Sequence, residues 1–358
     1  MVVRDVRSIA HLAQVDVRRA SRVAERYPFR ANDYYLSLID PADPEDPIRN
    51  LVVPREAELH DHGSLDASQE ALNTKLRGLQ HKYRDTAVLL VTDQCACFCR
   101  YCFRKRLFEP GSREATRETS RAIQYISQHP EITDVLVTGG DPLILPTHVL
   151  AETLHRLLVI PHVRTIRIGT KMPAFDPGRI VGDEGLLRLL GDVTAAGRAL
   201  YVMTHFDHPR EVTGLAREAL DALQSVGAQC LNQCPITRGV NDDVGVLAEL
   251  HQVMTEVGSP QYYVFQCRPT KGNSAFTVPI VESFSILAAA RERLSGLSRR
   301  SRLCMSHSTG KVEVVGVDDR AIYARYHRAK DPADEGRMLV LKRDDSATWL
   351  DDLEPLSA

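Results

Sequence analysis

The sequence has little that would place the protein in a membrane, in an oxidising compartment or on a nucleic acid. No apolar run approaches the roughly 18 residues that a membrane-spanning helix needs. Residues 1–20 carry arginines and aspartates without an apolar core, which is untypical of a secretory signal. Neither charge dominates, because 45 Lys and Arg stand against 47 Asp and Glu for a formal net charge of −2. We therefore expect a cytoplasmic protein with reduced thiols that binds neither nucleic acid nor membrane surfaces.

The middle of the 358-residue chain alternates short β-branched runs with longer amphipathic stretches. This alternation predicts a parallel sheet in an α/β protein, in the form of a partial (β/α)6 TIM-like barrel. A doubly wound open sheet is the alternative, although no G-x-G-x-x-G follows the first strand to support it. The predicted strands are residues 87–92, 134–140, 163–170, 199–205, 228–236 and 262–267, and the predicted helices are 117–131, 147–160, 184–197, 214–227 and 244–258.

Two flanking regions differ in texture from this barrel, which we assign to residues 81–299. Residues 1–80 are predicted to be an N-terminal helical region, with helical spacing over 8–29 and again from 69 to 83. The stretch between them, 39–61, is too rich in proline to predict regular structure. Residues 300–358 are predicted to form a small β-rich appendage that packs on the barrel, with strands at 311–317, 321–327 and 337–343.

Four of the eight cysteines fall in the stretch "CACFCRYC" directly after the first predicted strand. Cys95, Cys99 and Cys102 have C-x3-C-x2-C spacing, which suits three irons of a [4Fe-4S] cubane and leaves the fourth iron open to a ligand. A structural zinc ion is the rival, but it needs a fourth ligand and His81 is a poor candidate. Cys97 also makes a denser C-x-C-x-C pattern possible. The spacing favours the cluster.

Polar residues follow each of the six predicted strands, where the chemistry of an α/β barrel is found. Packing alone does not explain polar side chains at six successive strand ends. Besides the cysteine loop, they are Gly139-Gly140-Asp141, Arg167 with Gly169-Thr170-Lys171, Thr204-His205, Asn232-Gln233-Cys234 and Gln266-Cys267-Arg268.

These features together resemble the radical S-adenosylmethionine (SAM) superfamily and, within it, the lysine 2,3-aminomutase family. The likeness covers about residues 27–285 and weakens in the tail. The stretches that carry it, in order and spacing, are "YPFRANDYYLSLIDPADPEDPIRNLVVP", "HKYRDTAVLLVTDQCACFCRYCFRKR", "TGGDPLI", "IPHVRTIRIGTKMP", "THFDHPREVT" and "LNQCPITRGVND".

The resemblance implies roles for individual residues. The three spaced cysteines would bind the cluster, and SAM would chelate its open iron and be split to a 5′-deoxyadenosyl radical. Arg104 would hold the substrate carboxylate, for which a planar guanidinium is well suited. The residues implied around SAM are Gly139, Gly140, Asp141, Arg167, His205 and Gln233.

Enzymes of this family also bind pyridoxal phosphate (PLP) through a lysine, for which Lys311 in "HSTGKVEVVG" is the best match. Only Gly310 remains of the family's glycine run. Tyr83 keeps its place at the cofactor, but the arginine that grips the phosphate falls on Thr86, for which Arg84 could substitute.

Departures from the family's pattern bear on the substrate. Arg268 stands where the lysine enzyme has a carboxylate for the substrate's ε-ammonium, and Cys304 falls on the second such carboxylate. An arginine facing an ammonium is repulsive, so we expect a glutamate-like substrate rather than lysine. Arg268 could instead pair with an acid of the protein or carry the PLP phosphate. Asp243 occupies a zinc-ligand position of some relatives, so no zinc is expected.

The leading hypothesis is a radical SAM isomerase, an amino-acid 2,3-aminomutase that uses PLP and moves an α-amino group to the β-carbon. Family analogy also suggests a homo-oligomer and an electron donor such as flavodoxin or ferredoxin. One alternative is a radical SAM enzyme of other outcome, independent of PLP or acting on a protein lysine. Another is a non-catalytic iron–sulfur protein.

Overall fold

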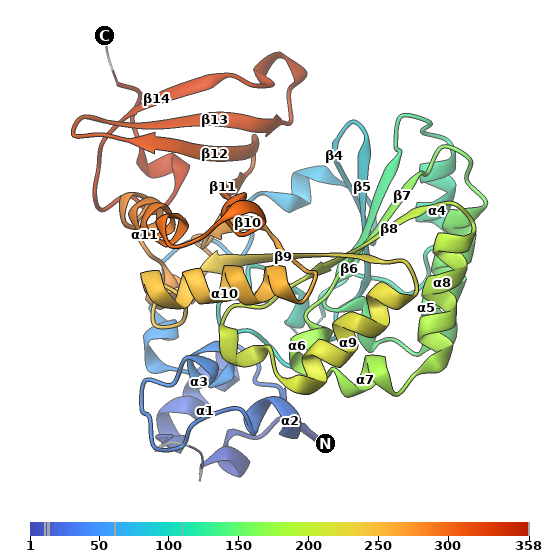
Figure 1. Ribbon diagram of the computed structural model, residues 1–358, viewed down its shortest axis with the longest axis horizontal. Helices are drawn as coiled ribbons and strands as arrows, with labels where there is room; N and C mark the ends of the chain where they lie inside the picture. The colour runs from blue at the N-terminus through green and yellow to red at the C-terminus, as the bar shows by residue number, and fades with distance from the viewer. Residues whose placement is uncertain (11, 13–14, 61, 110, 357–358) are drawn as a thin grey trace.

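The computed structural model describes residues 1–10, 12, 15–60, 62–109 and 111–356. The α/β class is confirmed, because the described strands β3 to β14 form one continuous twelve-stranded sheet in sequence order, with helices packed against it (Figure 1). The strands are β3 (Thr74–Leu76), β4 (Leu79–Tyr83), β5 (Thr86–Thr92), β6 (Asp134–Gly139), β7 (Thr165–Gly169), β8 (Ala199–Thr204), β9 (Gln229–Ile236), β10 (Gln261–Gln266), β11 (Arg302–His307), β12 (Gly310–Val317), β13 (Ala321–Ala329) and β14 (Met338–Lys342).

The strands from β5 to β11 run parallel to one another, whereas β3 and β4 at one end of the sheet and β12 to β14 at the other are joined by antiparallel ladders. The six predicted strands are confirmed as β5 to β10. The sequence analysis missed β11, whose residues "RLCMSH" mix charged and apolar side chains without a β-branched run. In the described part of the chain no ladder joins β3 to β14, so the sheet keeps two edges.

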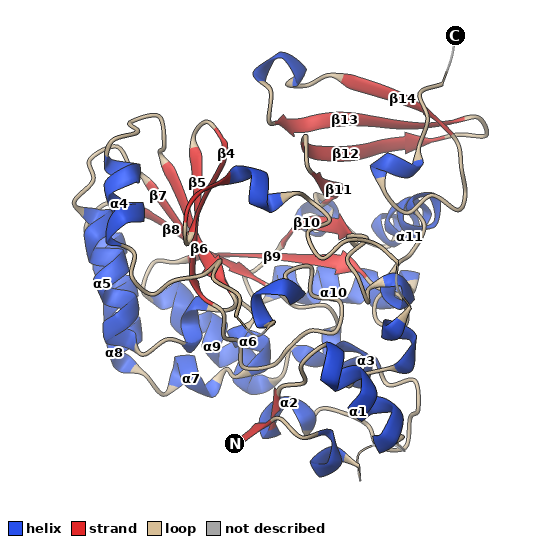
Figure 2. Ribbon diagram, turned by 180° about the vertical axis from the view of Figure 1, so that it is seen from behind, coloured by secondary structure: helices blue, strands red, loops and turns tan. Residues whose placement is uncertain are grey.

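The main helices alternate with the parallel strands, as predicted. Helices α8, α9 and α10 pack against β8, β9 and β10 and cover one face of the sheet (Figures 1 and 2). Apolar residues three and four apart supply the buried face of each helix, and a side-chain cap begins several of them, as Asp243 does for α10. The helices are α4 (Ser120–Ser127), α5 (Thr147–Leu158), α6 (Met172–Phe175), α7 (Gly178–Val181), α8 (Glu184–Ala195), α9 (Gly214–Ser225), α10 (Val244–Glu256) and α11 (Ile280–Glu292).

The N-terminal region is less helical than the sequence suggested. Helix α1 (Val17–Arg26) accounts for part of the stretch 8–29, of which residues 11 and 13–14 lie outside the described residues. Within the proline-rich stretch 39–61, which was predicted to be irregular, Asp46 caps a short helix α3 (Pro47–Val52). The other short elements before residue 60 are β1 (Val2–Val3), η1 (Val6–Ile9), β2 (Ala31–Asn32), α2 (Asp33–Leu36) and η2 (Glu56–Leu59).

The predicted helix over residues 69–83 is wrong. This stretch is a short 3₁₀ helix, η3 (Glu70–Asn73), followed by the hairpin of β3 and β4. Gly78 in the two-residue turn has φ +77°, a conformation that only glycine adopts without strain. The hairpin therefore overrides the helical spacing of the apolar residues.

The tail forms the three antiparallel strands that the sequence predicted. Through β11 these strands continue the main sheet, whereas a separate sheet packed on the barrel was expected. They stand at one end of the molecule beside α11, over a second core cluster that includes the buried Trp349 (Figure 1). None of the described helices has the length and apolar character to cross a membrane.

Candidate active site

The cysteine loop, residues 93–104, is fastened to the N-terminal region by a buried ion pair. The guanidinium of Arg100 donates to the carboxylate of Glu58 through Nε at 3.0 Å and Nη2 at 2.8 Å. Their side chains are only 2% and 0% exposed. The backbone N–H of Phe98 also donates to the carbonyl of Arg30 at 2.8 Å. This ion pair fixes the loop between its second and third spaced cysteines, and no motif in the sequence marks either partner.

The three spaced thiols, Cys95, Cys99 and Cys102, are half-buried and free. Burial raises the pKa of each. The charge of Asp141 and of the neighbouring thiols raises the pKa of Cys95 further, whereas Lys171 opposes the shift at Cys99. Among the described residues, no three His, Cys, Asp or Glu side chains are placed so that together they could bind one metal ion. A cubane does not need such a group, because each cysteine binds a different iron. Cys97 is 1% exposed and lies in the apolar core.

Two glycines at the end of β6 let the loop after this strand lie in contact with the start of the cysteine loop. A Cβ on Gly139, which has φ +124°, would stand 2.3 Å from the carbonyl oxygen of Thr92, and one on Gly140 would stand 2.3 Å from that of Gln94. The N–H of Gly140 donates to the Thr92 carbonyl at 2.6 Å. Only glycine permits this approach, so the β6 loop rests on the start of the cysteine loop.

Asp141 joins the loops that follow β6 and β7. Its carboxylate accepts hydrogen bonds from the Thr170 hydroxyl at 2.7 Å, the Lys171 N–H at 2.7 Å and the Leu143 N–H at 3.0 Å. Burial raises the pKa of Asp141 to about 6, although these bonds oppose the shift. The side chain therefore acts within the protein as a cap, and it holds two strand-end loops beside the cysteines.

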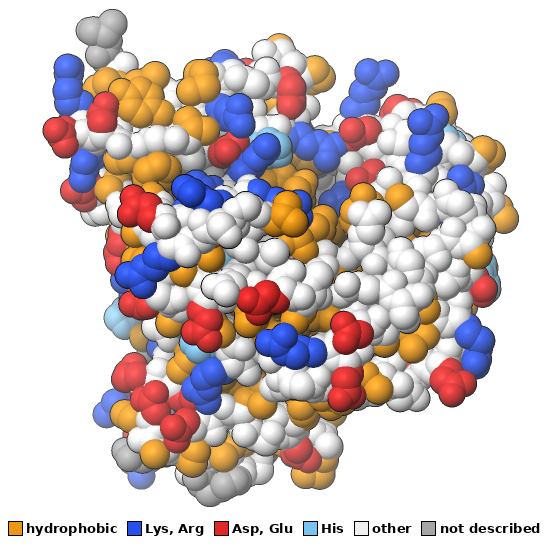
Figure 3. Space-filling view, viewed as in Figure 1, with side chains coloured by type: hydrophobic (Ala, Val, Ile, Leu, Met, Phe, Trp, Pro, Cys, Tyr) orange, Lys and Arg blue, Asp and Glu red, His pale blue; other side chains and the backbone are white. Residues whose placement is uncertain are grey.

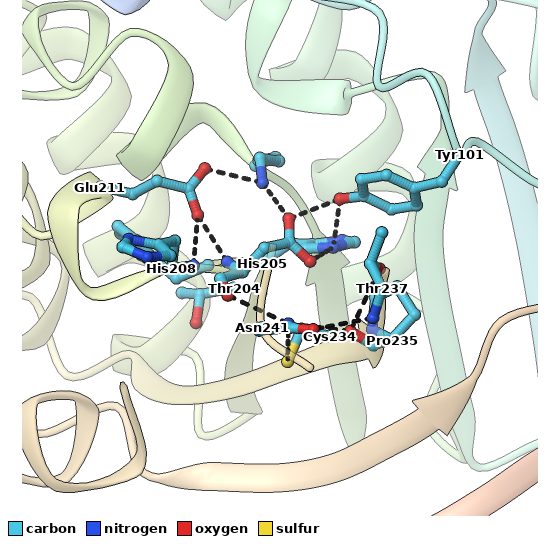
Figure 4. Close-up of polar contacts among 12 residues, drawn as sticks. Tyr101, Thr204, His205, His208, Glu211, Cys234, Pro235, Thr237 and Asn241 are labelled. Atoms are coloured by element: carbon cyan, nitrogen blue, oxygen red, sulfur yellow. Dashed lines mark hydrogen bonds and ion pairs between the residues drawn. The ribbon is translucent and has the colours of Figure 1, made fainter. Parts of the chain in front are cut away.

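A buried charge network lies beneath the cysteine loop (Figure 4). The Lys171 ammonium contacts Asp207 and lies 2.8 Å from Glu211. Burial would lower the pKa of Lys171, but these two carboxylates hold it well above its usual range. The Tyr101 hydroxyl donates to Asp207 at 2.5 Å and lies 3.0 Å from His205 Nε2, which is also 3.1 Å from Asp207. Since Tyr101 belongs to the cysteine loop, the network ties that loop to the end of β8.

Three predicted residues from separate strands lie on one face of the sheet. Cross-strand partners share a face, as do residues two apart along a strand. By these rules the ladders from β7 to β12 place Arg167, Gln233 and Lys311 on the same face. Arg167 forms an ion pair with Asp134 at 2.8 Å, whereas Gln233 is half-buried and has no hydrogen bond from its side chain to a described residue.

Lys311 projects over two aromatic rings of β10. Its Nζ lies 4.1 Å from the centre of the Tyr263 ring and 5.5 Å from that of Phe265. Burial lowers the pKa of Lys311 to about 8, and the charges of Arg167 and Arg268 add to this effect while Cys304 opposes it. Part of the amine is therefore neutral near physiological pH, as imine formation with an aldehyde requires.

Tyr83 lies near this lysine with a basic neighbour from the tail. The Arg328 guanidinium lies 4.2 Å from the centre of the Tyr83 ring, and its Nη2 lies 2.8 Å from the hydroxyl of Thr86. Arg328 is paired with Lys311 across β12 and β13, so both side chains leave the same face. Arg84 is exposed. The arginine that lies beside Thr86 is therefore Arg328 of the tail and not Arg84.

The two predicted substrate arginines converge on one acid. Nε and Nη2 of Arg104 lie 3.3 and 3.2 Å from the Glu70 carboxylate, and Nη1 of Arg268 lies 3.6 Å from it. Both guanidiniums also stack on the ring of Phe103, at 4.7 and 3.7 Å from its centre. Arg268 thus has an acid of the protein, Glu70, beside it. Glu70 belongs to no motif in the sequence and could not be identified from it.

Comparison with known proteins gives the family. No family model matches the chain. A protein of Aquifex aeolicus (strain VF5) named "Putative L-lysine 2,3-aminomutase" is 48% identical over 355 residues, which are 99% of this chain and 95% of the relative. The chain belongs to the lysine 2,3-aminomutase family of radical SAM enzymes.

Other members of the lysine 2,3-aminomutase family act on different amino acids by name. The "L-lysine 2,3-aminomutase" of Acetoanaerobium sticklandii is 36% identical over 266 residues, 74% of this chain and 63% of the relative. The "Glutamate 2,3-aminomutase" of Clostridioides difficile (strain 630) is 33% identical over 292 residues, 81% of this chain and 68% of the relative. The protein is accordingly an aminomutase, an isomerase of the radical SAM class.

In this member of the lysine 2,3-aminomutase family, basic side chains surround a hollow of the surface. Figure 3 shows Lys and Arg side chains gathered where the molecule is hollowed between the β12–β14 sheet and the strands around β4 and β7. Charges of Arg268, Lys330 and Lys311 act on Lys82 of β4, and burial together with these cations lowers the pKa of Lys82 to about 8. The site therefore favours an anionic ligand.

Proposed function

We propose that the protein is a radical SAM amino-acid 2,3-aminomutase that binds a [4Fe-4S] cluster, SAM and PLP. Lys311 carries the proposal. Its pKa is lowered to about 8, it faces two aromatic rings, and it shares a sheet face with residues implied around SAM. When bound, the cluster and SAM would supply a hydrogen-abstracting radical and PLP would supply an imine π system for the migrating nitrogen. The reaction is an isomerisation, so the hydrogen taken from the β-carbon is returned to the product.

We further propose that β5 to β11 form the wall of a partial barrel with the site inside it. Helices cover one face of these strands, whereas the opposite face carries Arg167 and Gln233, which are half-buried, and continues to Lys311 on β12. In a doubly wound fold helices cover both faces of the sheet, whereas in a barrel they cover only the outer face. The arrangement here therefore favours a partial barrel. A seventh strand extends the six-stranded wall expected from the sequence.

The residues toward each cofactor follow from these positions. Cys95, Cys99 and Cys102 would hold the cluster. Strands β6 to β9 and the loops that follow them would face SAM with Gly139, Gly140, Asp141, Arg167, His205 and Gln233. Lys311 would hold PLP over the rings of β10. Tyr83 would lie beside the PLP phosphate, since Lys82 Nζ lies 5.4 Å and the Arg328 guanidinium carbon 4.2 Å from the Tyr83 ring centre. Lys82 and Arg328 would be the cations of the phosphate, which would compete with the Asp85 carboxylate that contacts Arg328.

The charges around the site favour an acidic or polar substrate over lysine. Arg104 would hold the α-carboxylate and Arg268 the distal group. Glu70 is the acid near both, but it is already shared among three arginines. The ε-ammonium of a lysine substrate would therefore face cations without a free carboxylate to pair with. The named relatives include lysine and glutamate enzymes and do not decide the matter.

The test is an anaerobic assay with SAM, PLP and a reductant on L-glutamate and L-lysine, with the β-amino acid product identified by mass spectrometry. We expect the product from glutamate in excess, and the R268Q variant should reduce this preference. β-Lysine from lysine with no turnover of acidic amino acids would overturn the substrate proposal. A flavodoxin or ferredoxin is the proposed donor in the cell, and a homo-oligomer the proposed assembly.

A further inference from the structure

The Glu70 carboxylate contacts both arginines, Arg104 and Arg268, that the proposed function assigns to the substrate. One of its oxygens, Oε1, lies 3.2 Å from Nη2 of Arg104 and 3.6 Å from Nη1 of Arg268. The other, Oε2, lies 3.3 Å from Nε of Arg104 and 2.5 Å from Nη2 of Arg106. Its carboxylate is thus bound along the Nε–Nη2 edge of Arg104, in the two-point manner in which a guanidinium binds a carboxylate.

The backbone around Glu70 is held in a defined turn. Gln69 has φ +51°, the only positive φ of a non-glycine residue in the described part of the chain, and it immediately precedes Glu70. The carboxylate of Asp66 accepts hydrogen bonds from the N–H of Glu70 at 2.8 Å and of Ala71 at 2.9 Å. A strained residue and a cap therefore fix the turn that directs the Glu70 side chain into the arginines.

Glu70 also stays charged in its place. Its side chain is 12% exposed, and that burial opposes ionisation, but Arg104, Arg268 and Arg106 together hold the pKa of Glu70 well below its usual range. A carboxylate of the protein thus competes continuously for the positive charges that would recognise a carboxylate of the substrate.

We infer that Glu70 is a specificity-determining residue, an internal competitor that a substrate carboxylate must displace from Arg104 and Arg268. This inference rests on the proposed function, which assigns the two arginines to the substrate. A monocarboxylate such as L-alanine takes Arg104 only, so Glu70 keeps Arg268 and Arg106. A dicarboxylate such as L-glutamate takes both arginines and leaves Glu70 with Arg106 alone. Glu70 therefore weakens the binding of dicarboxylates more than that of monocarboxylates.

The experiment is a calorimetric titration of L-glutamate and of L-alanine into protein that carries cluster and PLP, without SAM or reductant, so that no turnover occurs. In the E70Q variant we expect L-glutamate to bind about tenfold more tightly, and L-alanine to gain clearly less. The matched control is E114Q, because Glu114 lies 2.8 Å from Nε of Arg106 and touches neither substrate arginine. E114Q should bind both amino acids as the wild type does.

Two results would overturn the inference: an unchanged or weaker affinity of E70Q for L-glutamate, or an equal gain for L-alanine. If E70Q does not fold, E70D withdraws the carboxylate by one methylene and should show the same order of gains, and equal affinities there are just as decisive. The R104Q variant tests the substrate role of Arg104 separately from the role of Glu70. Binding of both amino acids by R104Q as tight as in the wild type would remove Arg104 from the proposed function, whatever Glu70 does.

Discussion

The side chain of Lys311 on β12 reaches over β11 to Tyr263 on β10, where its amine lies 4.1 Å from the centre of the Tyr263 ring. A ring face attracts the charged amine, whereas burial and the nearby cations Arg167 and Arg268 favour the neutral form. Burial is the largest cause, and it lowers the pKa of Lys311 to about 8. The arrangement suits a lysine that must be neutral to bind an aldehyde, beside rings on which a flat cofactor can stack.

The rate of PLP uptake should therefore rise with pH, with a midpoint near the lowered pKa of about 8 rather than near the ordinary lysine value. A lysine with a lowered pKa releases its proton at a lower pH, so the reactive form appears earlier. The R167Q variant removes a neighbouring cation and should move the midpoint upward. Stopped-flow absorbance against pH measures this, and R188Q, on the exposed side of α8, is the control. A midpoint that does not move in R167Q would contradict the account.

The Glu58–Arg100 pair should be essential for stability and for the cluster. Substitution R100M leaves the fully buried Glu58 carboxylate without its main partner, which should cost about 3–5 kcal/mol of the free energy of unfolding. The double variant E58Q/R100M removes the charge as well and should lose less than the R100M variant. Urea unfolding and iron content per chain measure both effects. A stable R100M protein with full iron content would show that the loop is held by other contacts.

Cys97 should be dispensable for the cluster although it lies within the cysteine loop. Its side chain is 1% exposed among apolar residues, whereas the three spaced cysteines are half-buried. After anaerobic reconstitution, C97A should retain its iron and sulfide and the EPR signal of the reduced cluster. C95A, C99A and C102A should each lose most of the iron. Loss of the cluster in C97A with retention in C95A would mean that the ligand frame has shifted by two residues.

Arg328 should contribute to PLP affinity from the tail. Its Nη2 lies 2.8 Å from the Thr86 hydroxyl, and its β13 position is paired with Lys311. R328Q should weaken PLP binding about tenfold, as expected for loss of one charge-assisted contact to a phosphate. Fluorescence titration with PLP measures the affinity, and R337Q, whose partner Asp334 lies at the surface, is the control. Equal affinities of R328Q and the wild type would exclude this role.

The sequence predicted the central strands and helices well, because their signals are local. The runs that became β5 to β10 are short, largely apolar and bounded by glycine or polar residues, and the cysteine spacing is a pattern within eight residues. It predicted residues 69–83 wrongly, since the turn at Gly78 and pairing with β5 outweigh the helical spacing. The tail strands were predicted, but not their continuity with the main sheet, which depends on β11.

The site residues that the sequence missed share one physical cause. Glu58 and Glu70 are unremarkable acids in the sequence, and their partners Arg100 and Arg104 lie 42 and 34 residues away. Such pairings arise only when the N-terminal region folds back on the cysteine loop. Lys171 and Asp207 left a weak signal, since each stands just after a predicted strand, but their pairing beneath the loop also needed the fold.

The most direct test of the proposed function is an absorbance spectrum of the protein after anaerobic reconstitution with iron, sulfide and PLP, compared with the K311A variant. The account predicts a visible band of lysine-bound PLP in the wild type that K311A lacks, with equal cluster absorbance in both. A cluster spectrum without that band, or a PLP band that persists in K311A, would contradict the assignment of PLP to Lys311.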